Sequence, residues 1–274
     1  MAITLDQNFI TQWTDQVHVA FQQKKNKFVP CVSYLANQVG ETIKIPTVGA
    51  VNANTKATNA EVTILEPLHA SKTITVSNKY APLFFDKLDQ LKSNVAWQKH
   101  YVNLSVSAIN RAIDDAIITA LVSGSVTTTT TAGGLTYAKI KEALTALRAA
   151  EAAEDDDELY LAVSPDAMSD ALDETKLTSS DYMTMKSVID GKVSHALGFE
   201  WKHSTRLPTD TGPNPDVTTC VAWNKMAVWH ADNGMPTTEI NYVAMRVGWL
   251  INSFVGMGSV LVDTTGVVEI PVEL

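Results

Sequence analysis

The chain has 274 residues, of which 45% are hydrophobic, and its formal net charge at pH 7 is −9. Such an apolar fraction is typical of a globular protein with a sizeable core, so the composition excludes a mainly disordered chain. The acidic balance argues against a surface that neutralises nucleic-acid phosphates, because duplex binding requires clustered Lys and Arg.

Two cysteines, Cys31 and Cys220, lie far apart in the sequence and form no C-x-x-C pair. We therefore expect two buried, reduced thiols rather than a disulfide, a zinc site or a redox site. The first residues lack the basic flank and apolar run of a signal peptide, and no stretch reaches the ~20 apolar residues of a membrane span. The expected compartment is cytoplasm-like.

Residues 6–23 place apolar side chains at helical spacing, with glutamines elsewhere on the surface. This pattern predicts an amphipathic N-terminal helix whose stripe includes Phe9, Trp13 and Val17. The helix is followed by KKNK at 24–27, a cationic run that suits a helix C-terminus. The run is too short to favour a nucleic-acid-binding arm.

An extended excursion, rich in Asn and Thr, is expected over residues 40–82. Apolar and polar residues alternate in two runs that flank a tip with few large apolar side chains, which predicts two strands burying only one face. A lone two-stranded hairpin is marginal in water, so we expect this arm to lie on something else, such as a neighbouring subunit. The alternating apolar residues are Ile43 and Ile45 in the run over 40–46, and Ile74 and Val76 in the run over 70–80.

Apolar residues recur three or four apart over 93–123, which predicts one long helix. Ser93 or Asn94 can cap it, since either side chain can accept a hydrogen bond from the first turn, and Gly124 is a stop signal. At 1.5 Å per residue, ~29 residues span roughly 43 Å, more than twice the average for a globular protein. We expect this helix to act as a spine.

The second half of the chain alternates strand and helix signals. The threonine-rich segment 127–134 favours a β-run or loop, and Thr136 caps a following helix. The acidic run 154–158 lacks the alternating ligands and the Gly of a calcium loop, so we interpret it as a solvated loop. A buried strand is expected over 159–163, with Ser164 capping the next helix. Further strands are predicted over 218–223, 227–231 and 260–273.

Motifs for catalysis or cofactor binding are missing from the sequence. Gly256 and Gly258 come nearest to a dinucleotide fingerprint, but the third Gly is absent and the pair precedes a strand, so we interpret the segment as a bend. The six histidines form no i,i+4 metal pair. The closest two, His195 and His203, are more typical of surface or interface positions.

Two adjacent carboxylates, Asp114 and Asp115, lie on the predicted spine. Adjacent helical residues point about 100° apart, so the pair cannot act as acid and base on one substrate atom. We expect one of them to pair with a neighbour such as Arg111 and the other to face solvent. The sequence therefore predicts no catalytic site, no metal and no cofactor, and we expect the protein not to be an enzyme.

Several segments, taken in chain order, carry a family resemblance that covers nearly the whole chain. They are VGETIKIPTVG at 39–49, NRAIDDAII at 110–118, YLAVSP at 160–165, SDY at 180–182 leading to GKV at 191–193, LGFE at 197–200 running to Ser204 and LP at 207–208, and GVVEI at 266–270. With the order of helix, extended loop, spine and sheet, they make the chain resemble the major capsid protein of tailed double-stranded DNA bacteriophages, of the Hong Kong 97-type fold.

The resemblance implies an α+β fold with five parts. These are an N-terminal arm over 1–39, an extended β-hairpin (the E-loop) over 40–82, a P-domain over 83–159 that contains the spine helix 93–123, a mixed α/β A-domain over 160–260, and a C-terminal strand over 261–274 that returns to the P-domain.

The implied function is structural: hexamers and pentamers of this chain form an icosahedral head that encloses double-stranded DNA without sequence-specific binding and assembles in the host cytoplasm. Portal and decoration proteins are implied partners. Some members carry a long N-terminal scaffolding domain, but here the hairpin begins near residue 40, so we expect a separate scaffolding protein. The name-giving member crosslinks a Lys of its E-loop, but no motif marks a partner for Lys56, so we expect no covalent crosslink.

Candidate inter-subunit contacts are apolar residues of the arm and the hairpin, together with a lysine near the tip: Phe9, Trp13, Val17, Ile43, Ile45, Lys56, Ile74 and Val76. Two other functions stay open. An encapsulin-like nanocompartment shell shares the fold and would need a cargo-docking groove. An acidic α+β hydrolase would need a pocket with a perturbed acid.

Overall fold

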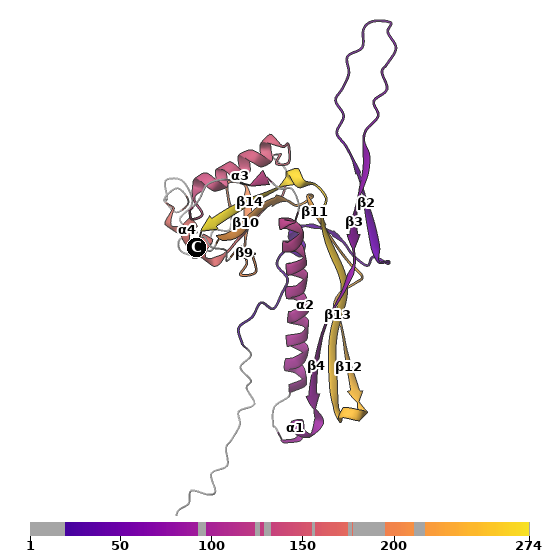
Figure 1. Cartoon of the computed structure of the whole chain (residues 1–274), viewed down its shortest axis with the longest axis vertical. Helices are drawn as coiled ribbons and strands as arrows, with labels where there is room; N and C mark the ends of the chain where they lie inside the picture. Colours follow the sequence, from indigo (N-terminus) through magenta and orange to yellow (C-terminus); the bar gives the residue numbers. More distant parts are fainter. Residues whose placement is uncertain are drawn as a thin grey trace, which may run out of the picture. The chain divides into compact units, whose positions relative to one another are not determined.

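The computed structural model describes residues 20–92, 97–123, 127–128, 133–154, 157–174, 177, 195–210 and 217–273. The fold is α+β (Figure 1), and it divides into two compact units. The first unit comprises Met1–Asn26, Asn78–Ala112 and Gly234–Val255; the second comprises Lys27–Ser77, Ile113–Asn233 and Gly256–Leu274. The long helix α2 (Trp97–Val122) and the long strand β13 (Gly248–Leu261) contribute to both units.

In the first unit, the N-terminal part of α2 packs on strands β4 (Ser77–Asp86) and β13. The hydroxyl of buried Ser105 on α2 donates to the Ala81 carbonyl (2.6 Å) and accepts from the Ser253 backbone N–H (3.2 Å), so one side chain ties the helix to both strands. Strand β12 (Thr237–Val243) runs antiparallel to β13, and the short helices α1 (Lys87–Lys92) and η3 (Ala244–Arg246) lie at the chain turns.

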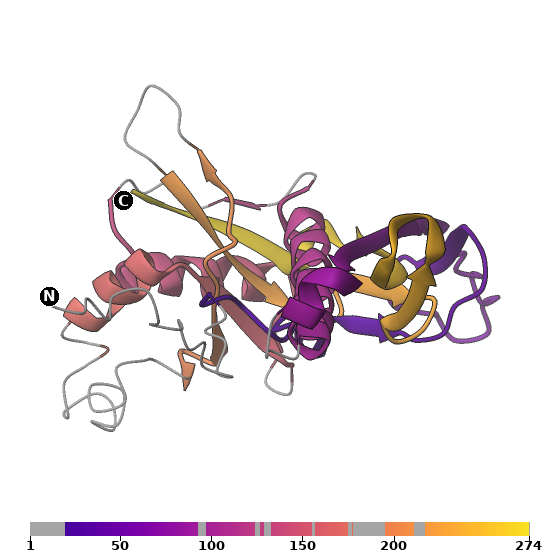
Figure 2. The same ribbon diagram turned by 90° about the horizontal axis from the view of Figure 1, so that it is seen from below.

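The second unit contains a mixed seven-stranded sheet (Figures 1 and 2), which carries many of the buried apolar residues. Strand β6 is buried at all five positions, as expected for a continuous apolar run within a sheet. The sheet order is β5 (Thr127–Thr128), β14 (Val267–Glu273), β10 (Val217–Asn224), β6 (Leu159–Val163), β8 (Phe199–His203) and β7 (His195–Ala196), with β9 (Thr209–Asp210) also paired to β10.

Two capped helices accompany this sheet. Helix α3 (Tyr137–Ala149) packs against β14, and the Thr136 hydroxyl accepts from the Lys139 N–H at its start. Helix α4 (Pro165–Asp173) follows β6, and Ser164 accepts from the Ala167 N–H. Both caps satisfy amides that have no partner inside the helix. The predicted strand-to-helix signals are therefore confirmed.

A hairpin of β2 (Thr42–Val48) and β3 (His69–Thr75) also belongs to the second unit. Ile43 lies opposite Ile74 in the antiparallel register. Ile45 and Ile74 are buried against Ala231 of strand β11 (Val228–Asp232), which pairs with β13 and with the short parallel strand β1 (Ser33–Leu35). This hairpin root also packs against Leu35, Ile43, Trp229, Val260 and Val262.

The spine and the paired runs agree with the sequence-based expectation. Helix α2 covers residues 97–122 of the predicted 93–123, and the alternating runs pair as β2 and β3. The proposed caps Ser93 and Asn94 and the stop at Gly124 lie outside the described residues, as do residues 155–156 of the acidic loop and the motifs at 180–182 and 191–193. Both thiols are free and buried, as expected.

Four expectations are corrected by the structure. The returning run over 70–80 is two strands, because the Val76 N–H donates to the Glu41 carbonyl and the chain then enters β4. The run over 260–273 is interrupted by the 3-10 helix η4 (Thr264–Gly266). Residues 20–24 are not helical, and the rest of the predicted N-terminal helix lies outside the described residues. Finally, Gly256 and Gly258 form no bend, since both lie inside β13.

Gly258 is needed for close packing rather than for turning. A Cβ at this position would lie 2.4 Å from the Thr75 carbonyl oxygen and 2.7 Å from Cγ2 of Ile74. The backbone of β13 therefore passes against the root of the hairpin with no room for a side chain.

None of the described helices is both long and apolar enough to span a membrane.

We expect Gly258→Ala to lower the free energy of unfolding of the unassembled subunit by roughly 1–3 kcal/mol, because the new methyl group forces the hairpin root apart. Gly49→Ala is the matched control, since a Cβ there would first meet Leu68 Cβ at 3.4 Å. Urea titration of both variants measures the effect. Equal stability of the two variants would show that the close approach at β13 is not a packing constraint.

Candidate assembly surfaces

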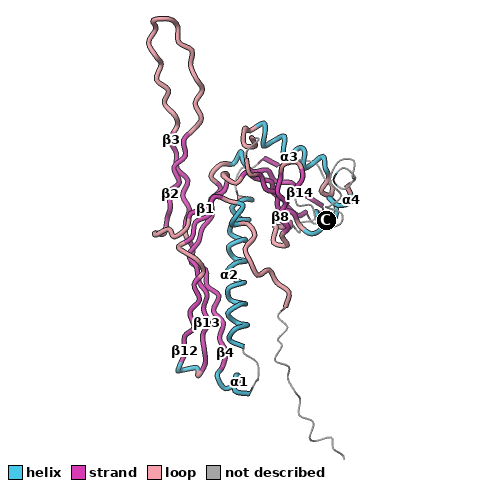
Figure 3. The backbone as a smooth tube through the Cα atoms, turned by 180° about the vertical axis from the view of Figure 1, so that it is seen from behind, coloured by secondary structure: helices cyan, strands magenta, loops and turns pink. Residues whose placement is uncertain are grey.

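The tip of the hairpin, residues 49–68, is extended chain beyond the ends of β2 and β3 (Figure 3). Its ends are closed by the Gly49 N–H, which donates to the Leu68 carbonyl (2.8 Å), and it turns back near Asn59, whose φ is +65°. Every residue from 49 to 66 is exposed. Several exposed side chains are large and apolar: Val51, Val62, Ile64, Leu65 and Leu68.

Such a tip has no core of its own. Scattered exposed apolar residues are normal, but several along one extended loop mark a surface that packs on something else. Ile64, for example, is 84% exposed. The tip is therefore the first candidate assembly surface.

The predicted contact residues of the hairpin lie in different environments. Ile45 and Ile74 are buried within this chain's own core, whereas Ile43 and Val76 are half-buried and Lys56 is exposed. The candidates of the N-terminal stripe lie outside the described residues: Phe9, Trp13 and Val17. A contact of any of these eight residues with a second subunit stays a prediction.

A second candidate surface is the N-terminal strap, defined here as residues 20–31. In the first unit, Asn110 of α2 donates to the Lys24 carbonyl (2.9 Å), and Arg111 donates to Oε1 of Gln22 (2.6 Å) and to the Gln23 carbonyl (3.2 Å). The strap thus reaches the body as extended chain bound along α2.

In the second unit, the end of the strap is fixed by a buried carboxylate. Asp114 is 0% exposed and accepts hydrogen bonds from the backbone N–H groups of Lys27 (3.0 and 3.1 Å) and Phe28 (3.2 Å). The fully buried Phe28 ring packs on Trp223, whose indole N–H donates to the Cys31 carbonyl (2.9 Å).

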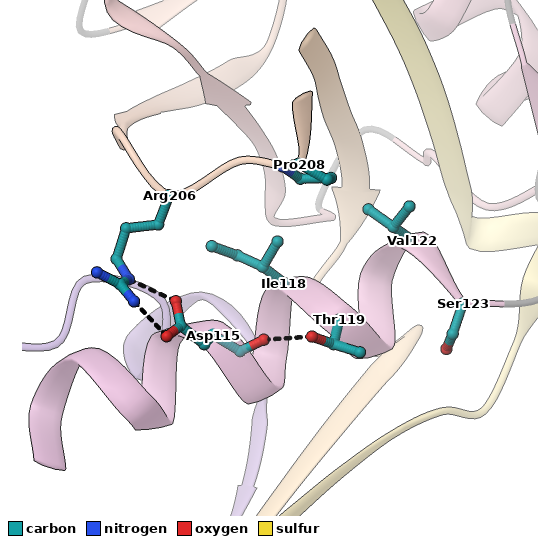
Figure 4. Close-up of a pocket in the computed structure, with 7 residues that line it drawn as sticks. All are labelled: Asp115, Ile118, Thr119, Val122, Ser123, Arg206 and Pro208. Carbon is teal, nitrogen blue, oxygen red and sulfur yellow. Dashed lines mark hydrogen bonds and ion pairs between the residues drawn. The ribbon is translucent and has the colours of Figure 1, made fainter. Parts of the chain in front are cut away.

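A surface pocket of about 470 Å³ adjoins the C-terminal end of α2 (Figure 4). Arg206 and Asp115 form a two-pronged ion pair at one side. The hydroxyls in the lining are satisfied locally, since Thr119 donates to the Asp115 carbonyl (2.7 Å) and Ser123 to that of Ala120 (3.0 Å). The pocket is lined by Asp115, Ile118, Thr119, Val122, Ser123, Arg206 and Pro208.

Of the expectation for the adjacent carboxylates, the ion pair is present with a different arginine, and the solvent-facing position is wrong. Asp114 does not face solvent but is completely buried on backbone donors, and Asp115 pairs with Arg206 rather than with Arg111. The partners of Asp114 and Asp115 are distant from α2 in the sequence, so the spacing of residues along one helix could not predict them. A carboxylate placed inside the apolar run around Ile113 and Ile117 was the available signal, because a buried charge requires a dedicated partner.

The remaining groups offer little chemistry. Burial raises the pKa of the Cys31 thiol to about 12 and that of Cys220 to about 11, so neither is a reactive thiolate near pH 7. His195 and His203 are exposed, as expected, whereas His230 is buried. Within the described residues, no group of three His, Cys, Asp or Glu side chains could hold a metal ion.

The fold is shared with solved structures from phages. A chain of Mycobacterium phage Che8 matches with a TM-score of 0.78 and 20% identity over 96% of this chain and 97% of that one. The capsid structure of the cyanophage P-SCSP1u matches with a TM-score of 0.78 and 17% identity, over 98% and 94%. The acidic stable capsid structure of Helicobacter pylori bacteriophage KHP30 gives 0.78 and 10%, over 100% and 98%. No curated protein matches the chain in sequence.

The α+β fold is therefore the fold of phage capsid structures. The family model for the phage capsid protein matches residues 5–273, and the chain belongs to this family. It is a structural protein of the virion and a subunit of the multi-subunit shell of the phage head. The α+β capsid fold implied by the resemblance is confirmed.

The stability of the subunit is expected to fall in mild acid because of His230. Its Nδ1 lies 2.8 Å from the Ser259 hydroxyl, its Nε2 is buried with no hydrogen-bond partner among the described residues, and burial lowers its pKa from 6.5 to about 4. The neutral imidazole is thus favoured by folding. The stabilisation is fully present above pH 6.5 and is lost as the pH falls towards 4, by roughly 3 kcal/mol.

Urea titrations between pH 7 and pH 4 measure this effect, with His230→Asn expected to flatten the slope. The neighbouring Tyr34 hydroxyl is hydrogen-bonded to Asp232 and does not titrate in this range, since the pKa of Tyr34 is raised to about 12. His195→Asn, which removes an exposed imidazole, is the matched control. An unchanged slope in His230→Asn would assign the acid sensitivity to other groups.

Proposed function

We propose that this chain is the major capsid protein of a tailed phage, that it forms hexamers and pentamers, and that these close an icosahedral head around double-stranded DNA. The observation that carries the proposal is the exposed apolar tip at 49–68, which has no packing partner in its own subunit among the described residues. A closed shell supplies such a partner for every copy, because symmetric assembly brings the same two surfaces together repeatedly.

The tip is the main contact in this proposal. Each side of it has about ten residues, which extend at most roughly 35 Å from the root. Ile64, Leu68 and their apolar neighbours then pack on an adjacent subunit, whereas Ile45 and Ile74 hold the root. Ile43 and Val76 are half-buried, so a neighbour could complete their burial. The N-terminal residues Phe9, Trp13 and Val17 make a second contact.

In this proposal the chain builds the wall of the shell and catalyses no reaction. The net charge of −9 suits a wall that should not hold packaged DNA tightly, since like charges repel. The free thiols are buried, and the ion pair of Arg206 and Asp115 leaves no spare carboxylate at the pocket for a hydrolase. Lys56 is exposed near the tip, but we expect no covalent crosslink, and a ladder of covalent oligomers on a denaturing gel would contradict this.

Other proteins complete the head in this proposal. Shell curvature depends on small changes of angle between subunits, so a separate scaffolding protein is expected to set it in the host cytoplasm. A portal and a decoration protein are further proposed partners. Efficient formation of correctly sized shells by this chain alone would remove the need for a scaffold. A nanocompartment shell is the alternative, and it would contain an enzyme cargo instead of DNA.

Particle mass and shape, measured by sedimentation and electron microscopy with and without a co-expressed scaffolding protein, test the proposal. Closed shells hundreds of ångströms across are the expected result, on the order of a small phage head. A monomer or dimer under every condition would overturn it. Enzyme cargo inside purified particles would favour the nanocompartment.

Replacing residues 50–67 by a two-residue Asn-Gly turn should abolish or strongly reduce shell formation while leaving the subunit folded, because the root at Ile45, Ile74 and Ala231 is untouched. The melting temperature of the unassembled subunit should change by about 2 °C or less. Lys56→Ala is the control, since it changes the tip without removing its apolar residues. Normal shells from the shortened chain would exclude the tip as a contact.

A further inference from the structure

The end of the N-terminal strap is held by backbone hydrogen bonds to a single side chain. Both oxygens of the Asp114 carboxylate accept from the Lys27 N–H, at 3.1 and 3.0 Å, and Oδ1 also accepts from the Phe28 N–H at 3.2 Å. Consecutive N–H groups that converge on one carboxylate form a small anion-binding concavity. Hydrogen bonds to an ionised acceptor are about twice as strong as neutral ones.

Burial makes this contact selective for one position of the strap. With the strap in place the Asp114 side chain is 0% exposed, so the Lys27 and Phe28 N–H groups occupy the positions from which water would otherwise donate to the carboxylate. A buried carboxylate without donors is strongly unfavourable. The chain at residues 27 and 28 is therefore confined to the place where its N–H groups meet the carboxylate.

The neighbouring contacts hold the same two residues of the chain. Phe28 is inserted beside Trp223, and a 3-10 turn, η2 (Val29–Cys31), returns the Cys31 N–H to the Phe28 carbonyl (2.9 Å). On the other side, the Lys27 ammonium donates to the His203 carbonyl (2.8 Å). The chain is thus held at Lys27 and Phe28 from both sides.

The neighbouring residue on α2 provides a natural contrast. Asp115 forms a partly exposed ion pair with Arg206, and within the described residues no hydrogen bond joins it to the strap. Two identical side chains, one residue apart, therefore differ in whether they bind the strap. This difference permits a test in which the same substitution is made at both positions.

We propose that Asp114 is a positioning residue for assembly: it fixes the chain at Lys27 and Phe28, so that the residues before them have less conformational freedom to lose when they contact a neighbouring subunit. The inference rests on the proposed function of residues 1–19 as a contact with a neighbouring subunit. The gain is entropic, because a pre-oriented segment loses less conformational freedom on binding. Asp114 acts here through the strap and touches no neighbouring subunit.

Asp114→Asn and Asp115→Asn form the matched pair for the test. The first substitution retains the size of the side chain, but it removes the charge and one acceptor oxygen. Trypsin cleavage after the exposed Lys24 and Lys25 reports the freedom of the strap. In Asp114→Asn this cleavage should be faster by on the order of tenfold, from more frequent local opening, and shell yield should fall. Asp115→Asn should match the wild type in cleavage rate and in shell yield.

Three results would overturn the proposal: wild-type cleavage in Asp114→Asn, equal acceleration in both variants, or faster cleavage with an undiminished shell yield. Faster cleavage with an undiminished shell yield could also mean that the arm makes no contact at all. Assembly of a chain without residues 1–19 distinguishes these two explanations. If that deletion assembles normally, the arm makes no needed contact. If it assembles poorly while Asp114→Asn assembles well, the arm matters but its anchoring does not.

Hydrogen exchange in the wild-type subunit tests the anchor even if Asp114→Asn fails to fold. The Lys27 and Phe28 amides should exchange at least ~100-fold more slowly than in an unstructured peptide, as expected for N–H groups bound to a buried acceptor. Exchange of both amides at the unstructured rate would refute the anchor. Slow exchange supports it, because these amides lie outside any strand or α-helix.

Discussion

A lone two-stranded hairpin is marginally stable in water, and this limit separates the residues that attach the hairpin to its own subunit from those that stay exposed. The root buries Ile45 and Ile74 against Ala231, where each isoleucine contributes about 2 kcal/mol through lost apolar exposure. The tip has no such support, and its apolar side chains remain in solvent in the isolated subunit. A hairpin with these two halves is stable at one end and incomplete at the other.

The two halves cannot exchange roles. A side chain that is buried at the root is unavailable to a neighbour, so Ile45 and Ile74 serve attachment, and contact with a neighbour is left to the tip in the proposed assembly. Firm attachment also makes the contact more favourable, because a pre-ordered segment loses less entropy when it binds. Gly258 contributes to the attachment of the root, because the absence of a side chain there lets the backbone of β13 pass directly against Thr75 and Ile74.

Local signals predicted the elements well and long-range partners poorly. The caps at Thr136 and Ser164, the stripe of α2 and the buried run of β6 depend on residues near in sequence, and all four are present. The bend expected at Gly256 and Gly258 was wrong because the reason for Gly258 is Thr75, a residue far away in sequence. The burial of Asp114 was missed for the same reason, since its donors at Lys27 and Phe28 are 87 and 86 residues away.

The two extended segments are joined to the body by closely similar means. The strap is fixed through the backbone N–H groups of Lys27 and Phe28, and the hairpin passes β13 with its backbone at Thr75 against Gly258. Backbone contacts do not depend on the identity of the side chain that bears them. In the proposed assembly, the side chains farther out on each segment are therefore free to match a neighbouring subunit, while body residues such as Asp114 and Gly258 contribute to the attachment. In such a chain, substitutions buried inside one subunit can alter assembly without changing any contact surface.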